Sequence, residues 1–205
     1  MSRSLLASVF LPSPNIEARR DGIRPDMLVL HYTGMPDARK ACRWLCDPVS
    51  KVSCHYLVDE NGAVTQMVDE GMRAWHAGVS SWKGREDLNS CSIGIEIQNP
   101  GHAAGYPDFP EAQMLAVVAL CKDIIARHAI HPTRVLAHSD IAPMRKIDPG
   151  EKFDWGQLHA QGIGHWVRPE PIEGGTFLQL GDRGPAVEAL QGMQLPPVKF
   201  FAGID

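Results

Sequence analysis

The segment HYLVDENGAVTQMV, residues 55–68, constrains the fold most strongly, because two extended runs flank the dipeptide Asn61-Gly62. Asn-Gly between apolar runs is the strongest short signal for a β-hairpin, since both residues readily adopt the positive φ angles of a tight turn. We therefore expect one antiparallel pair of strands here, whatever the rest of the sheet looks like.

The remaining segments alternate between extended and helical patterns. Extended runs occupy residues 27–34, 92–101 and 134–143, whereas helical patterns occupy 36–46, 110–130 and 153–162. The pattern at 110–130 repeats its apolar residues every 3.6 positions, as an amphipathic helix does. Strands that alternate with helices predict an α/β fold, with a mixed central β-sheet flanked by helices. Residues 72–89, rich in Gly, Ser and Trp, predict a long loop.

Charge and hydropathy exclude several classes of partner. The net charge of -4 provides no basic surface of the kind that draws proteins onto nucleic acid. No run reaches the roughly 20 apolar residues that span a bilayer. The N-terminal apolar run is interrupted by Pro12 and Pro14, and no cysteine precedes Cys42 to carry a lipid. We therefore expect no signal peptide, no lipid anchor, no membrane partner and a cytoplasmic location.

Five cysteines are an odd number for a disulfide framework, and a chain of 205 residues needs no such framework to stabilise its core. Cys42, Cys46, Cys54 and His55 are close enough in sequence to form a cysteine-rich zinc knot. The usual C-x2-C pairing is missing, however, so burial as small hydrophobic residues is the preferred alternative.

The composition changes near the C-terminus. Residues 168–175, RPEPIEGG, predict a linker after a main domain at 1–167. The remaining segment, 176–205, is shorter than the roughly 40 residues below which domains seldom fold unaided. We expect it to form a short C-terminal helical appendage.

Three candidate metal ligands lie where an extended run meets a turn: His31, His138 and Asp148. Loops converge at strand ends in α/β folds, so residues far apart in sequence can meet there. Two imidazoles and one carboxylate form a three-ligand set that leaves the fourth position of Zn²⁺ open for water, as in catalytic sites. Nine histidines offer other trios, and a hydrogen-bonded core or surface role is the alternative for each of them.

Two charged residues accompany these candidates. Glu96 lies within a strand between Ile95 and Ile97, where an unpartnered carboxylate would be costly to bury. It either pairs with a basic residue or faces a water molecule on the metal. Lys146 precedes Asp148 by two positions, so both side chains point the same way if the chain is extended. The alternative for Lys146 is a solvated surface charge.

Four blocks of sequence carry a resemblance that covers residues 13–165. They are SPNIEARRDGIRPDMLVLHYTGM, VSCHYLVDENGAVTQMVDEGMRAWHAG, NSCSIGIEIQNPG and VLAHSDIAPMRKIDPGEKFDW. Together they resemble the zinc-dependent N-acetylmuramoyl-L-alanine amidases of the AmpD and AmiD type, which are related to a phage lysozyme and to peptidoglycan recognition proteins.

The resemblance implies that His31, His138 and Asp148 hold one zinc ion and that Glu96 and Lys146 are the catalytic pair. It implies hydrolysis of the amide between the lactyl group of N-acetylmuramic acid and L-alanine of the stem peptide. We expect soluble (anhydro)muropeptides from cell-wall recycling as substrates. A lysin that attacks intact peptidoglycan is one alternative, and a peptidoglycan-binding protein without activity is another.

The same resemblance suggests substrate-binding residues, namely Trp75 and His76 in the 72–89 segment and Asn99 after the strand of Glu96. Trp75 and Trp82 could instead anchor the loop, and Asn99 could serve only the turn before Pro100. His55 and His76 compete as metal ligands, although His55 could pack beneath the site. The tail resembles the first helix of a peptidoglycan-binding module that is truncated here.

Overall fold

The structure is a computed structural model that describes residues 4–167, 178–179, 181 and 183–185. Contacts divide the chain into two units, residues 1–165 and residues 166–205. The predicted linker at 168–175 lies outside the described residues, as does most of the predicted appendage at 176–205, so both stay predictions. Among the described residues, no helix is both long enough and apolar enough to cross a membrane.

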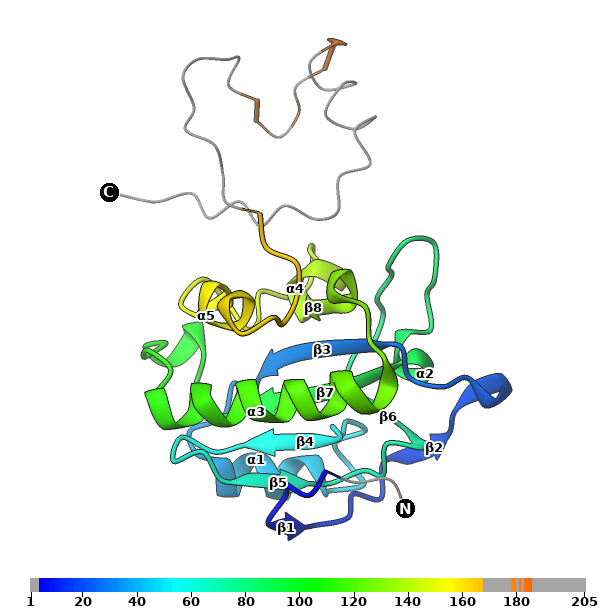
Figure 1. The fold of residues 1–205 in the computed structure, drawn as a ribbon, viewed down its shortest axis with the longest axis vertical. Coiled ribbons are helices and arrows are strands. Elements are labelled where there is room, and N and C mark those ends of the chain that lie inside the picture. The colour runs from blue at the N-terminus through cyan, green and yellow to red at the C-terminus, as the bar shows by residue number, and fades with distance from the viewer. Residues whose placement is uncertain (1–3, 168–177, 180, 182, 186–205) are drawn as a thin grey trace. The chain divides into compact units, whose positions relative to one another are not determined.

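A mixed six-stranded sheet forms the centre of the first unit among the described residues (Figure 1). Its strand order is β1-β5-β4-β7-β3-β8. In that order the strands are Val9–Phe10, Val64–Gln66, Tyr56–Val58, Ser92–Ile97, Met27–Tyr32 and Val135–Ala137. Strands β4, β7, β3 and β8 are parallel to one another, whereas β4 and β5 form an antiparallel pair around the Asn61-Gly62 turn. The predicted hairpin and mixed sheet are confirmed.

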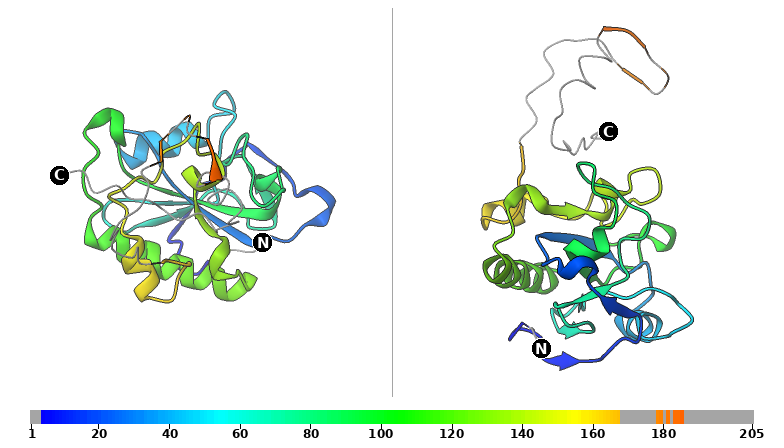
Figure 2. Two further views of the ribbon diagram at one scale, coloured as in Figure 1. Left: turned by 90° about the horizontal axis from the view of Figure 1, so that it is seen from above. Right: turned by 90° about the vertical axis from the view of Figure 1, so that its right-hand side faces the viewer.

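Two helices cover opposite faces of this sheet. Helix α3, Glu111–His128, lies on one face, and helix α1, Ala38–Leu45, lies on the other (Figures 1 and 2). Helix α1 begins after Asp37, whose carboxylate accepts a hydrogen bond from the Lys40 amide and caps the helix. The other helical segments are short: Arg20–Gly22 (η1), Leu88–Cys91 (α2), His102–Ala104 (η2), Pro132–Arg134 (η3), His138–Ile141 (α4) and Trp155–Ala160 (α5).

A buried carboxylate connects α3 to the sheet. Glu70 is fully buried and forms an ion pair with Arg127 of α3. It also accepts hydrogen bonds from the Tyr56 hydroxyl of β4, at 2.5 Å, and from the His128 ring, at 2.8 Å. Because a buried charge is tolerated only when it is paired and hydrogen-bonded, this network contributes to the docking of α3 on the sheet.

The prediction of one continuous loop at 72–89 is wrong in part. Residues Met72–Ala74 form β6, which is antiparallel to β2, Ile16–Ala18, in a second, two-stranded sheet. The residues before Ser92 form the short helix α2. The pairing partner of β6 lies more than 50 residues away, so nothing in the local pattern of residues 72–89 indicates a strand.

The strand register determines which side chains share the face beneath α1. His31 of β3 and Leu57 of β4 are both register partners of Glu96 on β7. Residues paired across neighbouring strands point to the same face of a sheet. Leu57 packs with Ala41 and Leu45 of α1, so His31 and Glu96 also face the α1 side.

Candidate metal centre and adjoining pocket

The three predicted metal ligands meet at the carboxyl-terminal edge of the parallel strands. Nδ1 of His31 lies 2.8 Å from Nδ1 of His138. The carboxylate oxygen Oδ2 of Asp148 lies 3.2 Å from the first of these nitrogens and 3.0 Å from the second. Among the described residues, these three side chains are the group whose ligand atoms converge closely enough to hold one metal ion.

The local structure around two of these ligands differs from the expectation. Strand β8 ends at Ala137, and His138 is the first residue of α4 rather than the last residue of a strand. The helix begins there because the Asp140 carboxylate accepts a hydrogen bond from the Ala137 amide, at 2.7 Å. Asp148 lies in a turn rather than in an extended run. Both side chains nevertheless remain at the edge of the sheet that His31 occupies.

The charges of this group suit a divalent cation. Burial, and after it the neighbouring His138, lower the pKa of His31 to about 4, so the ring is neutral at neutral pH. Burial alone would raise the pKa of Asp148, but hydrogen bonds with His138 and His31 outweigh it and hold that pKa well below its usual range. Imidazole nitrogens and one carboxylate oxygen are ligands that zinc accepts in catalytic sites, so the residues fit a zinc ion.

Glu96 lies on β7 as the register partner of His31. Burial raises the pKa of Glu96 well above its usual range, Asp148 raises it further, and Lys146 acts in the opposite direction. Its oxygen Oε2 is buried and has no hydrogen-bond partner among the described residues. A buried carboxyl group with a raised pKa holds a proton more readily than an exposed one, as a general acid must.

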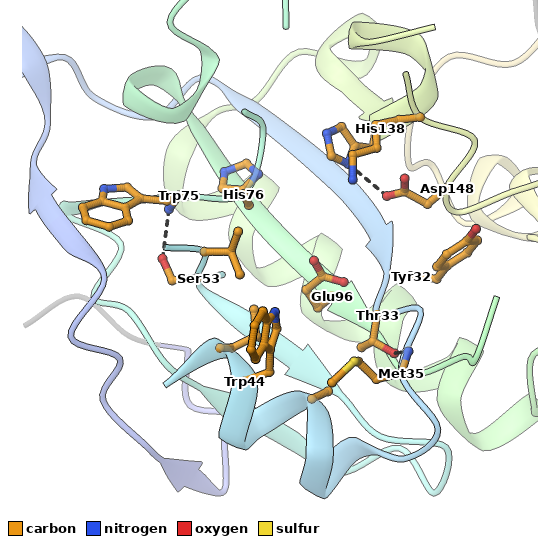
Figure 3. A pocket seen from close by; sticks show the side chains of 14 residues that line it. Tyr32, Thr33, Met35, Trp44, Ser53, Trp75, His76, Glu96, His138 and Asp148 are labelled. Atoms are coloured by element: carbon orange, nitrogen blue, oxygen red, sulfur yellow. Dashed lines mark hydrogen bonds and ion pairs between the residues drawn. The ribbon is translucent and has the colours of Figure 1, made fainter. Parts of the chain in front are cut away.

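Glu96, His138, Asp148 and Lys146 line one pocket of about 220 Å³. Since a water molecule takes up about 30 Å³ in the liquid, the pocket has room for part of a substrate. Figure 3 shows His138, Asp148 and Glu96 directed into this pocket, with Trp44 and Trp75 farther from the ligand group. Lys146 is partly buried and lines the same pocket as Asp148, although the i, i+2 argument assumed an extended chain and Asp148 lies in a turn.

The other predicted binding residues differ in their surroundings. Trp75 and His76 line the pocket, whereas Trp82 packs into a hydrophobic core cluster with Met27 and Val29 and therefore anchors its loop. The side chain of Asn99 donates to the Pro107 carbonyl, at 2.9 Å, and accepts from the Gly101 amide, at 2.9 Å. These contacts are those of a turn residue, the alternative that the sequence left open.

The competing metal sites are not assembled among the described residues. His55 is fully buried, accepts a hydrogen bond from the Gly94 amide and contacts Arg19 through its other nitrogen. Its ring packs edge-on against the His76 ring, with 5.7 Å between the ring centroids, and does not belong to the converging ligand group. All five cysteines are free thiols, and Cys54 is buried against Met67, in agreement with a role as small hydrophobic residues.

Two residues near the site were missed from the sequence. Trp44 lines the pocket from α1, and no local pattern distinguishes it from other partly exposed residues of that helix. Ser92 begins β7, and its hydroxyl contacts the His76 ring at 3.1 Å. Because Ser92 precedes Glu96 by four residues, strand alternation places both on the same face, and this signal could have identified it.

The sequence is similar to those of known amidases. Residues 21–151 match the family model described as N-acetylmuramoyl-L-alanine amidase. The chain is 47% identical over 155 residues to the N-acetylmuramoyl-L-alanine amidase AmiD of Escherichia coli, a match that covers 70% of this chain and 55% of AmiD. It is 34% identical over 167 residues to the 1,6-anhydro-N-acetylmuramyl-L-alanine amidase AmpD of Citrobacter freundii, covering 73% of this chain and 87% of AmpD.

A solved structure resembles the fold as well. It is the complex of AmiD from E. coli with the substrate anhydro-N-acetylmuramic acid-L-Ala-D-gamma-Glu-L-Lys. The TM-score is 0.65 at 45% sequence identity, and the match covers 73% of this chain and 62% of that chain. This chain thus spans little more than half of the AmiD relative and most of the AmpD relative.

Proposed function

The chain belongs to the N-acetylmuramoyl-L-alanine amidase family, and on this premise we propose that it hydrolyses the amide between the lactyl group of N-acetylmuramic acid and L-alanine of the stem peptide. The observation that carries the proposal is the convergence of His31, His138 and Asp148 at the edge of the pocket that also contains Glu96. Such a set is suited to activating water and polarising an amide.

His31, His138 and Asp148 would hold one zinc ion, which lowers the pKa of a water molecule to about 7 and polarises a carbonyl oxygen when it is present. Nδ1 of each histidine and Oδ2 of Asp148 are the ligand atoms that the distances favour. The neutral His31 ring and the ionised Asp148 carboxylate leave the group able to compensate the charge of a cation.

Glu96 acts as the general base and then as the general acid. It takes a proton from the attacking water and passes it to the alanine nitrogen as the amide bond breaks. Its raised pKa, which results first from burial and then from Asp148, favours the protonated form, as the second half of this role requires.

Lys146 stabilises the negative charge that develops on the amide oxygen when water adds. Its position on the wall of the same pocket supports this role, since a positive charge aimed at a developing oxyanion contributes more in the transition state than in the ground state. Trp75, which also lines the pocket, offers an aromatic face to the sugar or to the stem peptide.

We propose soluble anhydromuropeptides as the substrate class. AmpD is named for the 1,6-anhydro form, and AmiD is seen with an anhydromuropeptide, which supports this choice. A role in cell-wall recycling and a cytoplasmic location stay predictions, and hydrolysis of intact peptidoglycan is the competing hypothesis.

One experiment separates these hypotheses. The purified full-length chain is incubated with anhydromuropeptide or with intact sacculi, with chelator and after restoring zinc, and released stem peptide is quantified. We expect zinc-dependent release from the muropeptide, no release by the Glu96→Gln variant, and slow or absent release from sacculi. Release from neither substrate, with retained binding to peptidoglycan, would refute the enzyme and favour the non-catalytic binding protein.

A further inference from the structure

In both candidate histidine ligands, the nitrogen Nε2, which points away from Asp148, contacts one of two consecutive residues that follow β6, His76 or Ala77. Nε2 of His138 lies 3.1 Å from the Ala77 carbonyl oxygen. Nε2 of His31 lies 3.0 Å from Nδ1 of His76. A neutral imidazole carries its proton on one nitrogen only, so these two contacts decide which nitrogen of each ring is free to bind a metal.

The contact of His138 has one direction. A carbonyl oxygen can only accept, so Nε2 of His138 must carry the proton that it donates to Ala77. The other ring nitrogen, Nδ1, lies 3.0 Å from the Asp148 carboxylate, and it is the atom left to bind a metal, which takes the place of any proton held there.

The direction of the His31 contact follows from a longer chain of hydrogen bonds. The Ser92 hydroxyl lies 2.5 Å from the Leu88 carbonyl oxygen, which can only accept, so the hydroxyl proton is committed there. Ser92 must therefore accept at its other contact, from Nε2 of His76 at 3.1 Å. His76 is left with a lone pair on Nδ1, which accepts from Nε2 of His31 and leaves Nδ1 of His31 free.

The segment that carries His76 and Ala77 is itself held in place. Oδ1 of Asn89 accepts hydrogen bonds from both backbone amides, at 3.0 Å from His76 and 2.8 Å from Ala77. The Arg145 guanidinium donates to the Ala77 carbonyl at 2.8 Å. His76 is only 8% exposed, so its ring is bound in this network and has little surface to offer to a substrate.

We propose that His76 and Ala77, supported by Ser92 and Asn89, are positioning residues that hold both imidazole ligands with the proton on Nε2 and thereby present the two Nδ1 atoms to the metal. The inference rests on the proposed use of His31 and His138 as zinc ligands. It gives His76 a supporting role in place of the substrate contact expected from the sequence. Loss of such an outer partner typically reduces metal affinity about 10- to 100-fold.

The test measures zinc affinity of the full-length chain by competition with a chromophoric chelator. We expect His76→Leu to weaken zinc binding about 10- to 100-fold. The His76→Asn variant keeps an amide oxygen near the position of Nδ1 and should retain affinity within about threefold, because one neutral hydrogen bond is worth only a small factor. Ser92→Ala should weaken binding about 2- to 10-fold in the wild-type background and leave it unchanged in the His76→Asn background.

A loss of zinc affinity in these variants could also arise from unfolding, so the folded fraction is measured as a control. Urea unfolding of each variant in chelator shows how much of the metal-free protein is folded, and zinc affinities are compared for the folded fraction. Wild-type affinity in His76→Leu, or an equal effect of Ser92→Ala in both backgrounds, would overturn the inference. Absence of zinc binding by the wild type would instead overturn the metal site, and the inference with it.

Long-range ¹H–¹⁵N correlation NMR of the zinc-loaded protein reads the tautomers directly. We expect His31, His76 and His138 each to carry a single proton, on Nε2. A proton on Nδ1 of His76, or a metal bond to Nε2 of His31, would contradict the assignment even if the affinities changed as expected.

Discussion

Replacement of Gly94 by alanine tests the packing beneath the metal centre with a single methyl group. Gly94 lies on β7, two residues before Glu96 and on the same face of the sheet. A Cβ atom built at this position would lie 2.4 Å from Cγ, 2.6 Å from Nδ1 and 2.7 Å from Cδ2 of the His76 ring. The backbone of Gly94 does not have a positive φ angle, so the substitution acts through this contact and not through backbone strain.

The size of the clash predicts the effect. Ordinary contacts of a Cβ atom begin at 3.4 Å, whereas the new Cβ atom would lie 2.4 Å from Cγ of His76. The ring of His76 must therefore move by about 1 Å, the difference between these two distances. Overpacking of this kind costs about 1–3 kcal/mol of unfolding free energy. The same movement breaks the 3.0 Å contact between His76 and His31, so we also expect zinc affinity to fall about 10- to 100-fold.

The assay is a double-mutant cycle on the chelator-treated protein, with urea unfolding as the readout. His76→Ala removes the ring and creates room for the new methyl group, so Gly94→Ala should cost less in that background, by about 1 kcal/mol or more. Gly71→Ala is a matched control, because it is exposed, has no positive φ angle and approaches only the end of the Asp69 side chain, at 3.1 Å. It should change stability by no more than about 0.5 kcal/mol.

Two results would refute this reasoning. If Gly94→Ala has wild-type stability and zinc affinity, the ring of His76 does not rest on Gly94. If its cost is the same with and without His76, the destabilisation arises elsewhere on β7, and the ring is not the group that the methyl displaces.

Three further predictions concern charged residues. Lys146→Ala should keep zinc affinity within about threefold but lower kcat about 100- to 1,000-fold in the stem-peptide release assay, and near-normal turnover would exclude its role at the oxyanion. Glu96→Gln should bind zinc and substrate yet release no measurable peptide at any pH from 5 to 9, whereas residual turnover with a shifted pH optimum would point to another base. Glu70→Gln should lower the unfolding free energy by about 2 kcal/mol at pH 7, measured in urea. Burial favours protonation of Glu70, but hydrogen bonds from Arg127 and its neighbours outweigh burial and hold the pKa of Glu70 below the ordinary 4.5. The difference in unfolding free energy between wild type and Glu70→Gln should therefore shrink as pH falls below about 4.5. A difference that stays constant with pH would contradict the ion pair.

The parts of the fold that were predicted correctly are those with a local cause. The hairpin at Asn61-Gly62 depends on the turn preferences of two residues, and helix α3 depends on an apolar period within 18 residues. The strand β6 has no such cause, because its stability depends on pairing with β2, which precedes it by more than 50 residues. Pairing of this kind cannot be derived from a pattern that contains only one of the two strands.

The same contrast between local and long-range causes applies to the candidate site. Strand alternation is local, so it could place Glu96 on the face opposite Ile95 and Ile97, whereas only the register between β3 and β7 makes Glu96 a neighbour of His31. For His138 the expected strand end was wrong, since Asp140 caps a helix that begins at the histidine itself. The prediction of His138 as a ligand does not depend on this error, because the side chain lies at the carboxyl-terminal edge of β8 whether His138 ends the strand or begins the helix.

The hydrogen bonds of His76, Ala77 and Ser92 around the two histidine ligands could not be predicted from the sequence for a different reason. Residue types identify His31 and His138 as ligands, but affinity for a metal depends on which ring nitrogen carries the proton, and that depends on partners outside the ligand set. Strand alternation could have led to Ser92, yet its role follows only from the Leu88 carbonyl that fixes the direction of its hydroxyl. Every residue has a backbone carbonyl, so the sequence does not indicate which carbonyl accepts this hydrogen bond. Proton positions at this site are therefore a property of the folded backbone, and this is why substitutions at Ser92 and His76 test the structure more stringently than substitution of a ligand would.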